Sequence, residues 1–406
     1  MARIVQKFGG TSVADIEHIK NAAKHVKFEH DAGNQVIVVV SAMAGVTNQL
    51  VDYVNKVGKV FDPEEYDAVV SAGEQSNAGL MALAIQNLGI KSKSFLGWQI
   101  PIQTDAIHSK ARILNINTVK LEDRLEAGEV IVVPGFQGLG PNNRITTLGR
   151  GGSDLTAVAL AGALKADRCD IYTDVEGIYT TDPRIVSKAQ KLDKITYEEM
   201  LEMASLGSKV LQTRSVELAM NHGVKIQVRS SFENIPGTMV ISEDKIMEQQ
   251  VVSGISQSKD EAKITLLGVA DRPGIAASIF GPLADAEINV DMIVQNVSED
   301  GKTTDLTFTV GELDRENAVK VLEKHKSKVG IGEIIADADV VKISVVGVGM
   351  RSHAGVAQKM FKTLAEEGIN IKVISTSEIK VSVLVAEQYG ELAVRALHTA
   401  YGLDAD

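Results

Sequence analysis

The sequence has few of the residues that cross-link a chain, span a membrane or hold a metal. Cys169 is the only cysteine among 406 residues, which excludes an internal disulfide and favours a reducing compartment. The eight histidines show no zinc-like spacing, and no apolar run is long enough to span a bilayer. A formal net charge of −11 argues against nucleic acid or an anionic membrane as the main partner. Because folding signals begin within the first ten residues, we expect no signal peptide and a cytoplasmic protein.

Aliphatic residues are plentiful, although aromatic residues make up only 4% of the chain. The length predicts two or three domains, each with an aliphatic core. Unbroken β-branched runs alternate with helical patterns up to about residue 242, which predicts a mainly parallel sheet covered by helices on both faces. The clearest strand runs are 36–40 and 130–133, and the clearest helical patterns are 78–88 and 155–164.

The C-terminal part contains an internal repeat, which follows a charged linker or boundary helix at 243–250. The segment 268–276 is echoed by 347–357, with two residues added in the second copy. Apolar positions downstream match in the same way: Phe280, Leu283, Ile288 and Ile293 correspond to Phe361, Leu364, Ile369 and Ile374. Each copy is consistent with a strand, a glycine turn, a helix, two strands and a further helix, and we predict two βαββαβ units.

The segment 7–13, Lys-Phe-Gly-Gly-Thr-Ser-Val, lies between a short apolar strand and a helical pattern. Glycines let backbone N–H groups approach a phosphate, the start of a helix adds positive potential, and Lys7 supplies a point charge. We therefore predict an anion site here, with Thr or Ser capping the helix. A plain strand–helix connection is the structural alternative.

Four further segments follow strands or open helices, and each also has a purely structural interpretation. Segment 41–48 places small residues and hydroxyls after a buried strand, where α/β sheets bind ligands, or forms a capped loop. Glu74 lies in the first turn of a helix, where a carboxylate is favourable in any case. Segment 150–154 is a second Gly-Gly loop with an arginine fork that suits a carboxylate or phosphate. The long polar segment 172–184 could wrap a nucleotide or be a surface connection.

Taken in order, these motifs resemble the aspartate kinases of the amino-acid kinase family. The set is Lys-Phe-Gly-Gly-Thr-Ser, Ser-Ala-Met-Ala-Gly-Val-Thr-Asn, Gly-Glu, Arg-Gly-Gly-Ser-Asp and Thr-Asp-Val-x-Gly-Ile-Tyr-Thr-Thr-Asp-Pro-Arg. The duplicated C-terminal unit is similar to the tandem ACT domains that regulate those enzymes. The resemblance covers essentially the whole chain. It implies phosphoryl transfer from Mg-ATP to the β-carboxylate of L-aspartate, the first step toward lysine, threonine and methionine.

The resemblance also implies residue roles. For catalysis it implies Lys7, which neutralises charge on the transferred group, and Asp154, which organises Lys7. For the aspartate site it implies Ser41, Thr47, Glu74, Arg150 and Ser153, with Arg150 on a carboxylate and Glu74 on the ammonium. For ATP it implies Lys7, Gly9, Gly10, Thr173, Asp174, Tyr179, Asp182, Arg184 and Lys209, with phosphates also resting on Gly151 and Gly152. Dedicated metal ligands are not evident, as is usual for Mg²⁺ held by phosphates and water.

For regulation, the resemblance implies an amino-acid effector, lysine or threonine, at the seam between paired ACT units. The corresponding residues are Asp271, Asn289, Ile293, Gln295, Asn296, Asn370 and Ile374, with Gln295 and Asn296 forming a polar edge after a strand. We expect a kinase domain at 1–245 and ACT domains at 264–337 and 343–406, with strands exchanged between the ACT units near 330–342. A homo-oligomer assembled through these units is expected, and Met247 is placed where a shorter ACT-only subunit would start.

Two alternatives remain open on the sequence. One is a related kinase that acts on glutamate, acetylglutamate, carbamate or UMP. The other is an amino-acid-binding regulatory protein with an inactive kinase domain.

Overall fold

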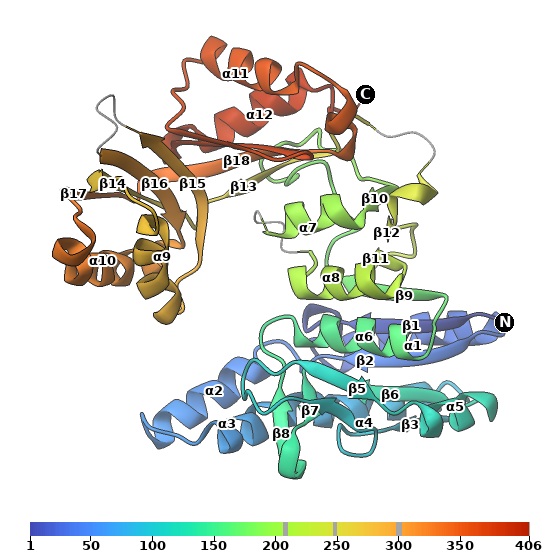
Figure 1. Ribbon diagram of the computed structural model, residues 1–406. Coiled ribbons are helices and arrows are strands. Elements are labelled where there is room, and N and C mark those ends of the chain that lie inside the picture. Colours follow the sequence, from blue (N-terminus) through green and yellow to red (C-terminus); the bar gives the residue numbers. More distant parts are fainter. Residues whose placement is uncertain (206–209, 247–249, 298–302, 406) are drawn as a thin grey trace. The chain divides into compact units, whose positions relative to one another are not determined.

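The structure is a computed structural model that describes residues 1–205, 210–246, 250–297 and 303–405 (Figure 1). The chain divides into two compact units. The first holds residues 1–178, 191–204 and 210–246, and the second holds 179–190, 205 and the described residues from 250 onward. Lys209 and Met247 lie outside the described residues.

The first unit is built on one sheet of eight described strands. In spatial order they are β10 (Lys194–Thr196), β12 (Thr238–Ile241), β11 (Ile226–Ser230), β9 (Arg168–Thr173), β1 (Arg3–Phe8), β2 (Gln35–Val40), β6 (Val130–Pro134) and β3 (Ser92–Ser94). Neighbouring strands are parallel except β11 and β12, which are antiparallel. The predicted mainly parallel sheet is confirmed.

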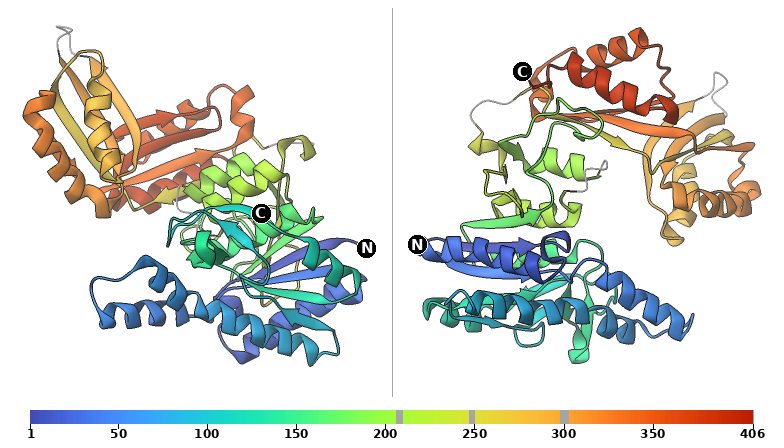
Figure 2. Two further views of the ribbon diagram at one scale, coloured as in Figure 1. Left: turned by 60° about the horizontal axis from the view of Figure 1, so that its bottom comes forward. Right: turned by 180° about the vertical axis from the view of Figure 1, so that it is seen from behind.

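Helices cover both faces of this sheet (Figures 1 and 2). Val36, Val38 and Val40 of β2 share one core with helices α1 (Ile16–Asp31) and α4 (Ala72–Gln86), whereas the intervening Ile37 and Val39 are buried toward the opposite face. A strand covered on both sides needs apolar residues at every position, which explains the unbroken β-branched run. The helices of this unit are α1 (Ile16–Asp31), α2 (Val46–Val57), α3 (Pro63–Val70), α4 (Ala72–Gln86), α5 (Val119–Glu126), α6 (Gly152–Ala163), α7 (Tyr197–Ser205) and α8 (Thr213–His222).

A smaller sheet lies beside the main one, in the order β5 (Ile113–Ile116), β4 (Ile102–Thr104), β7 (Gln137–Leu139) and β8 (Ile145–Thr147). One local prediction was wrong. The Gly-Gly turn leads into a short 3-10 helix at Thr11–Val13, and α1 begins only at Ile16. Its cap is Asp15, which accepts a hydrogen bond from the His18 backbone N–H, and neither Thr11 nor Ser12 caps it. Ser12 is buried instead, and its hydroxyl donates to the Tyr172 carbonyl.

The second unit contains two four-stranded antiparallel sheets, as expected for the duplicated βαββαβ pattern. The first runs β15 (Val290–Val297), β16 (Thr303–Val310), β14 (Ala262–Ala270) and β17 (Glu333–Asp337). The second runs β13 (Gly254–Ser258), β18 (Val340–Val346), β20 (Lys380–Ala386) and β19 (Val373–Thr376). Helices α9 (Ile275–Asp285) and α10 (Arg315–Val329) pack on the first, and α11 (Val356–Glu366) and α12 (Gly390–Ala400) pack on the second.

The second sheet is completed by a strand from before the first repeat. β13 pairs antiparallel with β18, whereas β17 remains in the first sheet beside β14. The strand that lies outside its own repeat is thus 254–258, and it does not come from the region 330–342. The predicted domain boundaries stay predictions, since the compact units also divide the chain differently by placing 179–190 in the second unit.

Residues 179–190 are tied to the second unit through buried polar contacts. The Thr180 carbonyl accepts from the Ile255 backbone N–H at 2.7 Å. The Thr180 hydroxyl lies 2.8 Å from His398 Nε2, and His398 Nδ1 lies 2.7 Å from Asp404 Oδ1. Thr180 and His398 are 2% and 0% exposed, so this part of segment 172–184 is not a solvated surface loop. Among the described residues, no helix combines the length and apolar character needed to cross a bilayer.

Candidate active site

A cavity of about 330 Å³ lies in the first unit, at the carboxyl ends of its central parallel strands. Loops that follow β1, β2 and β6 form its wall together with the first turn of α6. This edge is where parallel α/β sheets bind ligands, because the carboxyl ends of neighbouring strands meet there. The cavity brings together predicted site residues from four sequence segments: Lys7, Gly10, Ser41, Thr47, Glu74, Arg150, Ser153 and Asp154.

Lys7 and Asp154 form an ion pair at the cavity. Lys7 Nζ lies 2.5 Å from Asp154 Oδ1, and the two side chains are 11% and 9% exposed. Strand β1 fixes Lys7 between β2 and β9, and Asp154 lies in the first turn of α6, where a carboxylate is stabilised by the helix N-terminus. The Lys7 ammonium lies 3.3 Å from where a Cβ would stand at Gly9, so glycine leaves room for it. Asp154 therefore holds a positive charge beside the first glycine loop.

Glu74 is a buried carboxylate that faces the cavity and is only half satisfied. Its side chain is 4% exposed, and Oε1 accepts from the Ala42 backbone N–H at 3.2 Å. Within the described part of the chain, Oε2 has no hydrogen-bond partner. Burial raises the pKa of Glu74 from its ordinary value of 4.5 to about 7, since the charged form loses water. A cation entering the cavity would satisfy the free oxygen and favour the ionised form.

Arg150 supplies a free cation on the same cavity. Its side chain is exposed, and among the described residues it makes no hydrogen bond or ion pair. The neighbouring Gly151 has φ +73°, and a Cβ there would collide with the Gln212 side chain. Position 151 thus requires glycine both for its backbone conformation and for its packing. The turn at Gly151 places Arg150 at the cavity just before α6.

Three cavity residues were missed by sequence reasoning, namely Phe136, Gly149 and Gln212. Phe136 follows β6 in the left-handed region, with φ +69°, and its ring packs where a Cβ on Gly152 would stand. The position of Phe136 three residues after the buried run 130–133 was the available signal, because the carboxyl end of that strand meets those of its parallel neighbours. Gln212, which precedes α8, also lines the cavity, and no local pattern pointed to it.

The predicted nucleotide residues are divided between the units. Thr173 and Asp174 follow β9 in the first unit, with the Thr173 hydroxyl 3.1 Å from Asp174 Oδ1. Tyr179, Asp182 and Arg184 belong to the second unit. There the Arg184 guanidinium lies 2.7 Å from Asp182 Oδ2 and lowers the pKa of that carboxyl. The cavity therefore gathers the predicted aspartate residues together with Lys7 and Gly10 of the predicted nucleotide set.

The predicted effector residues lie in or beside β15 and β19 of the second unit, except Asp271, which follows β14, and all of them are exposed: Asp271, Asn289, Ile293, Gln295, Asn296, Asn370 and Ile374. Gln295 and Asn296 lie within β15 and pair with β16, so the prediction that they follow the strand was wrong. The strands β15 and β19 are edge strands of their sheets and lie side by side. A small apolar cluster of Met292, Val340, Val373 and Leu384 joins them.

Comparisons with known proteins agree with this arrangement. Residues 2–230 match the model of the amino acid kinase family, and residues 263–326 and 343–401 each match an ACT domain. An aspartate kinase of Stutzerimonas stutzeri is 56% identical over 406 residues, covering 100% of this chain and 98% of that protein. An aspartokinase of Pseudomonas aeruginosa is 55% identical over 407 residues, with the same coverage of both chains.

Among solved structures, E. coli aspartokinase III in complex with aspartate and ADP, described as the R-state, has a TM-score of 0.82. It is 27% identical and the match covers 98% of this chain and 99% of that chain. The same enzyme in complex with lysine and aspartate, described as the T-state, has a TM-score of 0.77 at 27% identity, with 98% of each chain covered.

Proposed function

This chain belongs to the aspartate kinases of the amino acid kinase family, and from that membership we propose how its own residues carry the reaction. The enzyme transfers the γ-phosphoryl group of ATP to the β-carboxylate of L-aspartate and gives 4-phospho-L-aspartate and ADP. The observation that carries the proposal is that one cavity holds two groups of opposite charge, Glu74 with an unpartnered carboxylate oxygen and the exposed Arg150, beside the Lys7–Asp154 ion pair.

Glu74 and Arg150 fit the two ends of an amino acid. The free Glu74 oxygen accepts from the substrate ammonium, which lets this carboxylate ionise in its buried position. Arg150 binds one substrate carboxylate with its planar fork. Ser41, Thr47 and Ser153 line the remaining wall and offer hydroxyl groups. The second substrate carboxylate is then left to reach the phosphoryl group beside Lys7.

The chemical step needs charge stabilisation and no base. A β-carboxylate oxygen attacks the γ-phosphorus, the bond from that phosphorus to the bridging oxygen breaks, and ADP leaves with the electron pair. The attacking carboxylate is already deprotonated, so Asp154 has no proton to take and serves to hold the Lys7 ammonium. Lys7 offsets negative charge on the transferred group, and the backbone N–H groups of Gly9, Gly10, Gly151 and Gly152 receive phosphate oxygens.

Mg²⁺ is proposed to enter with ATP. The cavity carboxylates are Glu74 and Asp154, and Asp154 is already paired with Lys7. This donor set fits an ion that keeps water and phosphate oxygens as most of its ligands and neutralises phosphate charge. The nucleotide itself is proposed to contact Thr173, Asp174, Tyr179, Asp182, Arg184 and Lys209, the last of which lies outside the described residues.

We propose feedback inhibition by lysine or threonine at the seam of β15 and β19. Two adjacent edge strands with exposed polar residues offer backbone and side-chain groups for an amino acid, and Gln295 lies on one of them. E. coli aspartokinase III has been solved with lysine, which supports lysine as the first effector to test. Assembly of copies through the ACT units, a shorter subunit that starts at Met247 and a cytoplasmic location are also proposed.

A coupled ADP-release assay tests the assignment. The enzyme with Mg-ATP should release ADP with L-aspartate, and much less with L-glutamate or with no amino acid. ADP release that prefers glutamate would point to a related kinase, and no release with any amino acid would point to a binding protein with an inactive kinase domain.

A further inference from the structure

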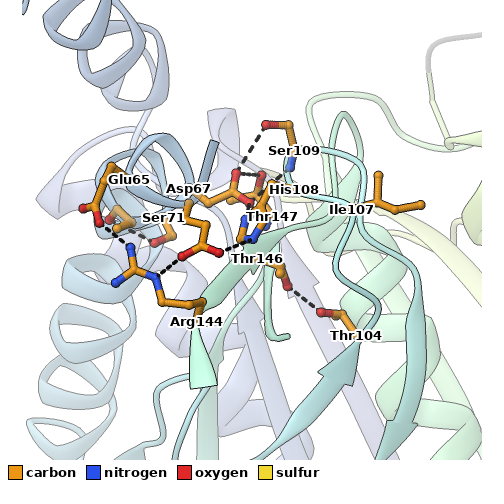
Figure 3. A network of polar contacts seen from close by, with 12 residues as sticks. Glu65, Asp67, Ser71, Thr104, Ile107, His108, Ser109, Arg144, Thr146 and Thr147 are labelled. Atoms are coloured by element: carbon orange, nitrogen blue, oxygen red, sulfur yellow. Dashed lines mark hydrogen bonds and ion pairs between the residues drawn. The ribbon is translucent and has the colours of Figure 1, made fainter. Parts of the chain in front are cut away.

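Asp67 is a buried carboxylate within a network of polar contacts (Figure 3). It lies on α3, is 0% exposed, and binds two other segments of the chain. Its carboxylate accepts from the Thr147 backbone N–H at 2.9 Å and from the Thr147 hydroxyl at 2.6 Å. It also lies 2.7 Å from His108 Nδ1 and accepts from the Ser109 backbone N–H at 3.1 Å. Burying a carboxylate costs free energy because the group loses water, and these hydrogen bonds offset that cost. Their partners therefore indicate what Asp67 does in the structure.

One side of the network holds the loop that carries Arg150. Thr147 is the last residue of β8, and Arg150 follows three residues later. Ser109, another partner of Asp67, packs against this loop, because its carbonyl oxygen lies 3.0 Å from where a Cβ would stand at Gly149. Arg214 braces the same loop by donating to the Leu148 carbonyl at 2.8 Å. Asp67 therefore fixes the start of the Arg150 loop through two separate partners.

The backbone of Asp67 leads to the second charged substrate group. The Asp67 carbonyl accepts from the Ser71 N–H at 3.2 Å in the last turn of α3. The helix α4 begins at the next residue, Ala72, and places Glu74 in its first turn. The backbone of Asp67 is thus connected to the helix start that carries Glu74, and its side chain is hydrogen-bonded to the start of the loop that carries Arg150.

We propose that Asp67 is a positioning residue that sets the separation of Arg150 from Glu74 and thereby the affinity for aspartate. The inference rests on the proposed roles of Arg150 and Glu74. Binding groups that must meet two ends of one small molecule lose much of their effect when displaced by about 1 Å. Asp67 does not line the cavity, so it acts through the loop and has no contact with the substrate.

The same network supplies a matched control. The Thr104 and Thr146 hydroxyls lie 2.6 Å apart, and both side chains are buried. Thr104 belongs to β4 of the same small sheet, but its hydroxyl does not touch Asp67 or the Arg150 loop. Thr104→Val and Thr147→Val therefore each remove one buried threonine hydroxyl from the same small sheet. Only Thr147→Val removes a hydrogen bond between Asp67 and the start of the Arg150 loop.

The experiment measures KM for aspartate and for ATP in the full-length protein and in Asp67→Ala, Thr147→Val, Thr147→Ser and Thr104→Val. We expect Asp67→Ala and Thr147→Val to raise the KM for aspartate about tenfold and to leave the KM for ATP within about twofold. Thr147→Ser keeps the hydroxyl and should restore the wild-type constant. Thr104→Val should lower thermal stability without changing the ratio of the two constants.

The inference is overturned if both constants rise together in Thr147→Val, or if Thr104→Val shows the same selective change. Should Asp67→Ala fail to fold, Thr147→Val and its serine counterpart decide the matter. Failure of the proposed function is a different result, since the wild-type enzyme would then show no aspartate-dependent release of ADP.

Discussion

Replacing Glu74 with glutamine should stabilise the free enzyme while destroying its affinity for aspartate. The buried carboxylate has one oxygen without a hydrogen-bond partner among the described residues, and its pKa is raised to about 7. Its ionisation at pH 8 therefore lowers the free energy of unfolding. Glutamine is nearly isosteric, can still accept from the Ala42 N–H, and carries no charge. Because the substrate ammonium would then meet an amide in place of a carboxylate, the KM for aspartate should rise about a hundredfold.

The pH dependence of this effect follows from the raised pKa. Between its ordinary value of 4.5 and about 7, folded Glu74 holds a proton that the unfolded chain has released. The folded state therefore binds more protons, and the contribution of this group to stability falls as pH rises through that window. Above about pH 7 the loss of stability is complete. The difference between a pKa of 4.5 and one of about 7 corresponds to about 3 kcal/mol in the free energy of unfolding. Glu74→Gln should gain stability of that order at pH 8 and little at pH 4.5.

Chemical denaturation at the two pH values and initial rates between pH 6 and 9 measure both parts. In the wild type, kcat/KM for aspartate should fall about tenfold per pH unit below pH 7, since only ionised Glu74 receives the ammonium. In Glu74→Gln this limb should disappear. Equal stability of the two proteins at both pH values, or a wild-type profile flat from pH 6 to 9, would refute the reasoning.

Three further predictions concern the remaining proposed roles. Lys7→Ala and Asp154→Ala should each lower kcat about a hundredfold or more with an unchanged circular dichroism spectrum, and near-normal turnover would remove the residue from the mechanism. Arg150→Lys should raise the KM for aspartate far more than the KM for ATP in steady-state assays, because an ammonium cannot replace a planar fork; a shift confined to ATP would place Arg150 in the nucleotide site. Gln295→Ala should relieve inhibition by lysine or threonine and leave uninhibited turnover unchanged, whereas a wild type that calorimetry shows to bind neither amino acid would exclude the effector site.

The sequence predicted those parts of the fold that rest on local chemistry. The β-branched run 36–40 became strand β2, and the glycines of both predicted loops, Gly10 at the first and Gly151 and Gly152 at the start of α6, line the cavity. The duplicated pattern gave two antiparallel sheets. What it could not predict depends on distant pairing: nothing local in 254–258 shows that this strand joins β18. The packing of residues 179–190 with the second unit likewise depends on the hydrogen bond between Thr180 and His398, which is more than two hundred residues away in the sequence.

The candidate site was predicted in outline for a similar reason. Lys7 lies near the end of β1, Glu74 lies in the first turn of α4 and Arg150 precedes α6, and parallel strands bring their carboxyl ends together. The raised pKa of Glu74 could not be foreseen, because it depends on burial by several loops. Phe136 requires a positive φ that its own residue type does not suggest, and Asp67 acquires its role from Thr147, eighty residues further along the chain.

Trapping the phosphorylated product tests the central claim most directly. The enzyme is incubated with Mg-ATP and hydroxylamine, together with L-aspartate, with L-glutamate or with no amino acid, and the hydroxamate and ADP are measured side by side. An acyl phosphate on the β-carboxylate should give aspartyl hydroxamate in equal amount to ADP, and only with L-aspartate. ADP formation without hydroxamate, or equal hydroxamate formation from L-glutamate, would contradict the account.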